Sequence, residues 1–119
     1  MMKYDHNNIF AKIIKNDLPC DLIKENKNAL AFKDISPRAP VHILIIPKAG
    51  YINYHDFITN ASKEEIIDLH ELLKEIIVDL KLDHKGYRII TNTGDDGNQD
   101  VKHLHFHLLG GKNLGLMVK

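Results

Sequence analysis

The chain of 119 residues contains a single cysteine, Cys20, and no tryptophan. One thiol excludes an internal disulfide and fits a reducing compartment. No apolar run approaches the roughly 20 residues that span a bilayer, and the first residues lack the apolar region of a signal peptide. Lysine and arginine total 16 and balance 16 aspartates and glutamates, so there is no basic excess for nucleic acid or membrane surfaces. These absences predict a cytoplasmic protein that binds neither nucleic acid nor a membrane.

The overall composition is that of an ordinary globular domain, with 44% hydrophobic and 27% charged residues. A chain of this length can bury a core of its own, so one domain over residues 1–119 is expected. The unusual feature is histidine, which occurs eight times. The positions of these histidines point to the function more directly than anything else in the sequence.

Periodicity and turn residues predict an α+β fold with a mainly antiparallel sheet. Ser62 and Glu65 form a capping-box pattern ahead of apolar residues at helical spacing, so a long helix is expected over residues 62–82. The run 41–46 is apolar on both faces, which is typical of a central strand. The other expected elements are a short helix over 9–14 capped by Asn7 or Asn8, a hairpin of strands 21–25 and 29–33, an irregular stretch over 48–61, and strands over 87–92 and 101–109.

Three histidines alternate with apolar residues in the segment HLHFHL, residues 103–108. Side chains of a strand point alternately to its two faces, so His103, His105 and His107 are expected on one face and the apolar residues in the core. A row of imidazoles fits two kinds of site. One is a metal site, because imidazole binds Zn²⁺. The other is a phosphate site, where one imidazole attacks phosphorus while its neighbours hold its tautomer and protonate the leaving group.

The loop before this segment favours the phosphate site. Residues 94–99, Gly-Asp-Asp-Gly-Asn-Gln, include two glycines, and such a loop can turn several backbone N–H groups toward an anion. A metal site needs carboxylate or thiolate partners at ligand spacing, and Cys20 lies far away in the sequence. The residues alone leave both kinds of site open.

Taken together, these segments resemble the histidine triad (HIT) family, and within it the Hint branch of nucleoside phosphoramidate hydrolases. The resemblance covers residues 9–111. It implies a five-stranded antiparallel sheet with one long and one short helix, continued across a homodimer. The stretches that carry it, in the expected order and spacing, are IFAKII (9–14), AFKDISPRAP (31–40), HILIIPK (42–48), KGYR (85–88) and residues 92–111.

The family pattern implies that His105 is the nucleophile and forms a transient nucleotidyl-histidine bond. His107 is implied to reach the phosphate or the leaving group, and His103 helps to build the site. His42 would hydrogen-bond the far nitrogen of the nucleophile and fix its tautomer. The implied reaction is cleavage of the P–N bond of a purine nucleoside 5′-phosphoramidate in two displacements, without a metal or cofactor.

The resemblance also implies how the nucleotide is held. Asp34 would accept hydrogen bonds from the ribose hydroxyls, an apolar slot would hold the base, and polar residues would meet the phosphate and the leaving group. The slot residues are Phe10, Ile13, Phe32, Ile35 and Leu44; the polar residues are Asn92, Asn98, Gln99 and Asp100; and Phe106 completes the nucleotide-binding set.

Two residues depart from the Hint pattern. Gly50 stands where the pattern has a histidine two residues after the lysine of Ile-Pro-Lys, which would shorten a proton relay behind His42. Nearby His55 is one candidate substitute. Asp100 stands where the best-known members have a serine near the leaving group. Its carboxylate would repel a phosphoryl oxygen or bind a cationic leaving amine.

The sequence therefore predicts, first, a nucleotidyl hydrolase acting on purine nucleoside phosphoramidates. The alternative is a nucleotide-binding regulatory protein with incidental hydrolysis, which the residues at positions 50 and 100 leave open. A third reading is a structural zinc protein, which would carry stoichiometric metal.

Overall fold

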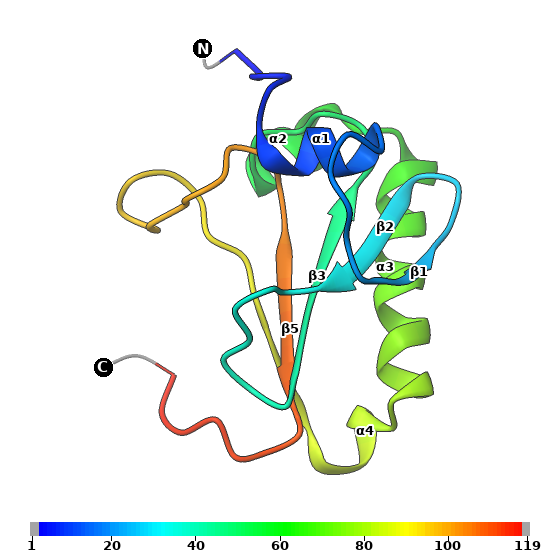
Figure 1. Cartoon of the computed structure of the whole chain (residues 1–119), viewed down its shortest axis with the longest axis vertical. Helices are drawn as coiled ribbons and strands as arrows, with labels where there is room; N and C mark the ends of the chain where they lie inside the picture. Colours follow the sequence, from blue (N-terminus) through cyan, green and yellow to red (C-terminus); the bar gives the residue numbers. More distant parts are fainter. Residues whose placement is uncertain (1–2, 118–119) are drawn as a thin grey trace.

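The computed structural model describes residues 3–117, which form a five-stranded antiparallel sheet with helices on both faces (Figure 1). The predicted α+β class and antiparallel sheet are confirmed. The strand order is β1-β2-β3-β5-β4. The strands are β1 (Leu22–Glu25), β2 (Ala29–Lys33), β3 (Val41–Pro47), β4 (Tyr87–Ile90) and β5 (Phe106–Gly110); the helices are α1 (Ile9–Ile14), α2 (Tyr54–Asn60), α3 (Lys63–Asp79) and α4 (Leu82–Lys85).

The strand β3 lies in the middle of the sheet, and the alternation of its side chains separates two cores. Ile43 and Ile45 belong to the larger core, which includes the buried face of α3. Leu44 and Ile46 belong to a smaller core with Phe10 of α1. Both faces of β3 are therefore covered, as the continuous apolar run predicts. One face packs in the larger core and the other in the smaller core beside α1.

The helix α3 begins as predicted and ends early. The side chain of Ser62 accepts a hydrogen bond from the Glu65 amide at 3.1 Å, and the Glu65 carboxylate accepts one from the Ser62 amide at 3.1 Å, so the capping box is complete. The helix ends at Asp79 because Lys81 adopts a left-handed backbone with φ 56°, which no helix can continue. Among the described residues, no helix has the length and apolar composition to cross a bilayer.

The strand β5 begins at Phe106, five residues later than predicted. The register pairs Ile45 with Phe106, so Leu104 would face Pro47 if the ladder continued. Proline has no N–H to donate, and the ladder stops there. The Leu104 amide donates to the Tyr51 carbonyl at 2.7 Å instead. Two of the three histidines therefore precede the strand rather than lying in it.

The stretch 48–61 was expected to be irregular, and this is wrong: it contains the helix α2. The Asn53 side chain accepts a hydrogen bond from the Asp56 amide at 2.9 Å, which caps the helix, while Asp56 accepts one from the Ile52 amide at 2.8 Å. The sequence shows no helical pattern of apolar residues here, because Phe57 is the one residue of α2 that is buried in the core. With α4, residues 3–117 contain four helices where the resemblance implied two.

Candidate active site

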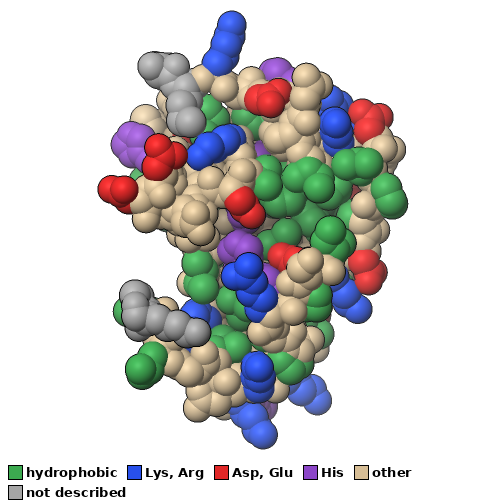
Figure 2. Space-filling view, turned by 60° about the vertical axis from the view of Figure 1, so that its left-hand side comes forward, with side chains coloured by type: hydrophobic (Ala, Val, Ile, Leu, Met, Phe, Trp, Pro, Cys, Tyr) green, Lys and Arg blue, Asp and Glu red, His purple; other side chains and the backbone are tan. Residues whose placement is uncertain are grey.

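The face of the sheet that carries α1 contains a pocket of about 270 Å³. This volume lies near the lower end of the roughly 300–1,000 Å³ typical of small-molecule sites. Its walls are mainly apolar, and Figure 2 shows hydrophobic side chains gathered beside histidines on this side of the molecule. The predicted site residues that line it are Phe10, Ile13, Phe32, Asp34, Ile35, Leu44, Asp100, His105 and His107.

Part of the pocket wall was not identified from the sequence. Ile9 has a visible signal, because it begins the apolar pattern of α1. The others lie in loops or at a strand end, where only the tertiary fold brings them to the pocket. The wall residues absent from the predicted set are Ile9, Leu18, Pro19, Cys20, Lys33 and Val101.

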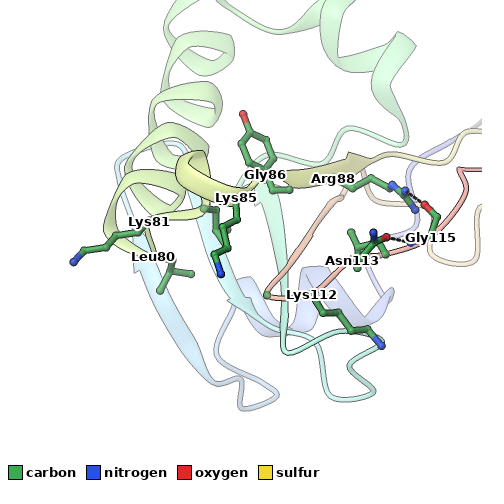
Figure 3. A pocket seen from close by; sticks show the side chains of 12 residues that line it. Leu80, Lys81, Lys85, Gly86, Arg88, Lys112, Asn113 and Gly115 are labelled. Atoms are coloured by element: carbon green, nitrogen blue, oxygen red, sulfur yellow. Dashed lines mark hydrogen bonds between the residues drawn. The ribbon is translucent and has the colours of Figure 1, made fainter.

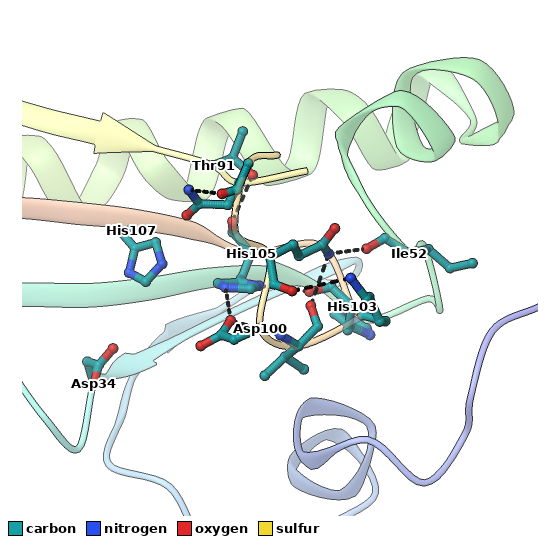
Figure 4. Close-up of polar contacts among 12 residues, drawn as sticks. Asp34, Ile52, Thr91, Asp100, His103, His105 and His107 are labelled. Atoms are coloured by element: carbon teal, nitrogen blue, oxygen red, sulfur yellow. Dashed lines mark hydrogen bonds and ion pairs between the residues drawn. The ribbon is translucent and has the colours of Figure 1, made fainter. Parts of the chain in front are cut away.

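The imidazole of His105 is buried, and its hydrogen-bond partners define its tautomer. Its Nδ1 lies 2.8 Å from the carbonyl oxygen of His103, and a carbonyl only accepts, so Nδ1 carries the hydrogen. Its Nε2 therefore presents a lone pair, 3.5 Å from a carboxylate oxygen of Asp100 (Figure 4). The ring packs edge-on against Phe10, with centroids 5.0 Å apart. In its neutral form the ring thus presents the lone pair of Nε2 at the pocket wall.

A second chain of hydrogen bonds sets the tautomer of His107. The Arg38 amide donates to Nδ1 of His42 at 3.1 Å, so Nε2 of His42 carries a hydrogen. That nitrogen lies 2.9 Å from Nδ1 of His107 and donates to it. His107 consequently has its own hydrogen on Nε2, where it serves as a donor in the pocket.

The prediction that His42 holds the nucleophile is wrong, because its partner is His107. The register pairs Leu44 with His107 and His42 with Leu109. His42 and His107 are thus diagonal neighbours on the same face of the sheet, within reach of each other. His105 is two residues farther than His107 from Leu109, the residue opposite His42. The tautomer of His105 is fixed by a main-chain carbonyl instead.

Burial keeps the second pair of histidines neutral. Burial and, to a lesser extent, the nearby rings of His105 and His42 lower the pKa of His107 to about 4. Burial also lowers the pKa of His42, against the opposing effect of Asp34, whose carboxylate oxygen lies 3.4 Å from its Nε2. At neutral pH His107 is therefore an uncharged donor until an anion arrives beside it.

His103 was predicted to share a face with the other two, but its ring does not line the pocket. It lies on the same side of the sheet, with its ring centroid 6.1 Å from that of Phe10, and it is fully buried. Its Nε2 donates to the Pro47 carbonyl at 2.8 Å, and its Nδ1 lies 2.6 Å from the hydroxyl of Tyr4. Burial lowers its pKa to about 4. It acts on the site through its main-chain carbonyl.

Two of the polar residues predicted to contact phosphate, Asn92 and Gln99, form hydrogen bonds within their own part of the chain. Gln99 is buried, donates to the carbonyls of Ile52 and Val101 at 2.7 and 2.9 Å, and accepts from the Gly94 amide at 3.1 Å. The Asn92 side chain donates to the Gly97 carbonyl at 2.7 Å. The amides of Gly94, Asn98 and Gln99 are likewise used within the loop, so the predicted cradle of free N–H groups is not formed by them.

The side chain of Phe106 faces away from the pocket. It belongs to the larger core and packs edge-on against Tyr54, with centroids 5.7 Å apart. The strand alternation that directs His107 into the pocket directs Phe106 to the opposite face. The prediction that Phe106 belongs to the nucleotide-binding set is therefore wrong, because its ring is buried in the larger core.

Three ligand-type groups lie close together beside the pocket. Asp34, His42 and His107 each offer an atom within 4.8 Å of the others, and within residues 3–117 this is the group with metal-like spacing. The two histidines already use facing nitrogens in their mutual hydrogen bond, which a metal would have to break. Cys20 does not belong to the group, so the arrangement differs from a closed structural zinc site.

A larger hollow of about 700 Å³ lies elsewhere, between α4, β4 and the segment after β5 (Figure 3). Its basic side chains include Lys81, Lys85 and Lys112, and Arg88 donates to the Gly115 carbonyl at 2.7 Å. Among the described residues that line it, none is a histidine or a carboxylate. The chemistry of the histidine segment is therefore confined to the smaller, apolar pocket.

Histidines of one segment, set against an apolar pocket on an antiparallel sheet, define a histidine triad protein. The model of the HIT domain matches residues 15–114. Because this match covers most of the chain, the protein belongs to the HIT domain family.

Relatives and solved structures agree with this assignment. The chain is 50% identical over 111 residues to an uncharacterised HIT-like protein of Rickettsia prowazekii, covering 93% of this chain and 92% of the relative. A HIT family hydrolase from Clostridium thermocellum is 41% identical, with a TM-score of 0.82 and coverage of 97% and 99% of the two chains. A histidine triad nucleotide-binding protein from Candida albicans is 31% identical, with a TM-score of 0.77 and coverage of 95% and 87%.

The buried, neutral His103 predicts acid destabilisation. Its folded pKa of about 4 lies below the ordinary 6.5, so the unfolded chain takes up the proton first. The neutral His103 therefore contributes about 3 kcal/mol to the free energy of unfolding. This contribution is complete above pH 6.5 and is lost as the pH falls toward 4. Urea titrations from pH 7 to 4 measure how steeply the free energy of unfolding falls with pH. The slope for His103→Gln should be smaller than that of the unaltered protein by an amount equal to about one proton taken up on unfolding. His84→Gln, at an exposed position of α4, is the control; an unchanged slope for His103→Gln would contradict the prediction.

Proposed function

We propose that this protein is a nucleotidyl hydrolase that cleaves the P–N bond of purine nucleoside 5′-phosphoramidates through a nucleotidyl-histidine intermediate. The observation that carries the proposal is the tautomer of His105, whose lone pair on Nε2 faces an apolar pocket. The similarity to a HIT family hydrolase and to a histidine triad nucleotide-binding protein supports the hydrolytic and nucleotide-binding parts of the proposal.

The pocket suits a nucleoside monophosphate group. Phe10, Phe32 and Leu44 offer an apolar slot for a planar base, with a polar group at the rim. The Asp34 carboxylate also lines the pocket and accepts a hydrogen bond from the Ser36 amide, which fixes its orientation. We propose that its second oxygen, which lies 3.4 Å from Nε2 of His42, accepts hydrogen bonds from the ribose hydroxyls. This order of groups brings the phosphorus toward His105.

In the first displacement, Nε2 of His105 attacks phosphorus and forms a P–N bond to the imidazole. The bond from phosphorus to the leaving amine breaks, and its electron pair stays on the amine nitrogen, which takes a proton. Nδ1–H of His105 remains bonded to the His103 carbonyl throughout, so the positive charge that develops on the ring is stabilised at its far side.

His107 is the group that meets the charge on the phosphoryl oxygens. Its Nε2–H donates to an oxygen, and the negative charge of a bound phosphate raises its pKa from the value in the free protein. Substrate binding thus prepares it to deliver a proton to the amine, an effect worth roughly 10²- to 10⁴-fold in rate. In the second displacement, water attacks phosphorus and gives a proton to His107, the P–N bond to His105 breaks with its electron pair returning to Nε2, and nucleoside monophosphate is released.

Replacing the nucleophile tests the proposal. His105→Ala should abolish release of amine from an adenosine 5′-phosphoramidate while adenosine monophosphate still binds, because the base slot and Asp34 are unchanged. Single-turnover reactions of the unaltered protein, quenched in denaturant, should carry the nucleotide on His105. The matched control is His84→Ala, which should keep full activity.

Other outcomes would decide against the proposal. Tight nucleotide binding without release of amine would indicate the regulatory alternative. Stoichiometric zinc in the purified protein, with unfolding on chelation, would indicate a structural metal protein. Turnover that persists in His105→Ala would show that another group is the nucleophile.

Asp100 gives the leaving-group side of the site a negative charge. Its carboxylate is mostly exposed, lies 3.5 Å from Nε2 of His105, and accepts a hydrogen bond from the Val101 amide at 2.8 Å. In an in-line displacement the amine departs from the face of phosphorus opposite Nε2 of His105, so we take the leaving-group role of this charge from the resemblance, in which the residue at this position lies near the leaving group. We propose that it favours leaving amines that carry a further positive charge.

A matched pair of substrates measures this preference. Adenosine 5′-phosphoramidates of 1,4-diaminobutane and of 4-aminobutanol differ in one ammonium group. At an exposed site a charge pair about 4 Å apart is worth about 1 kcal/mol, so Asp100→Asn should reduce the preference for the diamine about fivefold in kcat/KM. Asp95→Asn, in the same loop, should leave the ratio unchanged. An unaltered ratio in Asp100→Asn would remove Asp100 from leaving-group selection.

We also propose that two copies associate as a homodimer through the edge strand β4. Strand β4 pairs with β5 on one side, and its outer edge offers unpaired backbone groups that a second copy can use. Tyr87 and Ile89 expose apolar surface there, at 43% and 39% of their full accessible area. Pairing around a two-fold axis would make one continuous sheet.

Charge placed at this edge should disrupt the dimer. Ile89→Lys is expected to elute as a monomer in size-exclusion chromatography with light scattering, because two buried ammonium groups would face each other across the axis. Leu22→Lys, at the exposed opposite edge strand β1, should remain dimeric. A monomeric unaltered protein, or dissociation of both variants alike, would contradict this interface.

A further inference from the structure

The side chain of Tyr4 contacts the histidine segment from the far end of the chain. Its hydroxyl lies 2.6 Å from Nδ1 of His103, 99 positions away in the sequence. The two rings meet edge to face, with centroids 5.6 Å apart and an interplanar angle of 65°. No element of the catalytic arrangement described above uses this tyrosine.

The direction of this hydrogen bond is fixed by the other side of the ring. Nε2 of His103 faces the Pro47 carbonyl, which only accepts, so Nε2 carries the hydrogen of the neutral ring. Nδ1 is therefore an acceptor and the Tyr4 hydroxyl is the donor. Burial raises the pKa of Tyr4, so the hydroxyl keeps its proton at neutral pH. Both nitrogens of a fully buried imidazole are thus satisfied.

Gly50 makes room for this ring. A Cβ built on Gly50 would lie 2.7, 2.8 and 2.9 Å from three ring atoms of Tyr4, closer than such contacts occur. The backbone of Gly50 is outside the left-handed region, so its conformation alone does not require glycine. The position is the one at which the Hint pattern has a histidine. The space in front of it is occupied here by the tyrosine, whereas His55 is exposed.

We propose that Tyr4 is a positioning residue for the nucleophile, and that it takes the place of the histidine that the Hint pattern carries at position 50. The Tyr4 hydroxyl holds the ring of His103, and the His103 carbonyl holds Nδ1 of His105. The departure at Gly50 therefore concerns the support behind His103, and not a relay behind His42. The kinetic part of this inference rests on the proposed function.

Removing the hydroxyl alone separates positioning from packing. Tyr4→Phe keeps the ring over Gly50 and deletes the donor. We expect kcat for an adenosine phosphoramidate to fall about five- to tenfold at unchanged KM, less than the roughly 100-fold that an ångström of misplacement can cost. The nitrogen NMR signal of Nδ1 of His103 should shift, as should the Nδ1–H proton of His105. Tyr54→Phe, whose ring packs on Phe106, is the matched control and should change none of these.

A rescue experiment tests the replacement of one residue by the other. Tyr4→Ala opens the space beside position 50, and adding Gly50→His places an imidazole there. The double variant should recover kcat severalfold relative to Tyr4→Ala, whereas Tyr4→Ala with Gly50→Ala should not. Gly50→His alone should lower kcat, because the new side chain displaces the Tyr4 ring.

Two results would overturn the inference. One is wild-type kcat together with unchanged His103 and His105 signals in Tyr4→Phe. The other is equal activity in the two double variants, which would remove the claim of replacement. If the unaltered protein has no turnover, the proposed function fails, and the NMR comparison of Tyr4→Phe with Tyr54→Phe still decides whether Tyr4 positions the nucleophile.

Discussion

The chemistry of the site depends on one hydrogen bond, from Nδ1 of His105 to the carbonyl of His103. A main-chain carbonyl accepts a hydrogen bond and cannot donate one, so it selects one tautomer of the neutral ring. In the neutral ring the lone pair is therefore on the opposite nitrogen, which is directed at the pocket. The three histidines divide the work: His105 offers an electron pair, His107 a hydrogen, and His103 its backbone.

That carbonyl is available because of Pro47. Where β3 ends in proline, the ladder with β5 stops, and the segment before Phe106 leaves the sheet. Carbonyls inside a ladder are committed to the neighbouring strand, whereas that of His103 is free to bind a side chain. The same proline supplies the oxygen that holds the His103 ring. Pro47 thus ends the ladder between β3 and β5 and also holds His103 in place.

The sequence was sufficient for features set by local pattern. The capping box at Ser62, the central strand and the apolar slot around Phe10 and Leu44 follow from periodicity and the resemblance. It was insufficient where a partner is chosen in three dimensions. The partner of His42 is His107 and not His105 because of the register between β3 and β5. Gln99 hydrogen-bonds to the Ile52 carbonyl because of the way its loop folds back on the chain. The helix α2 was missed because its capping residues are polar and its apolar contact is small.

The hydrogen-bond chain through His42 begins at the main-chain amide of Arg38. Every residue except proline has such an amide, so the polarity of the chain is encoded without any particular side chain at that position. Substitution at position 38 by any residue other than proline therefore keeps this main-chain donor, although the positive charge of Arg38 also helps to lower the pKa of His42. Proline is the exception: it would allow both imidazoles to reverse their tautomers and would leave an acceptor facing the pocket.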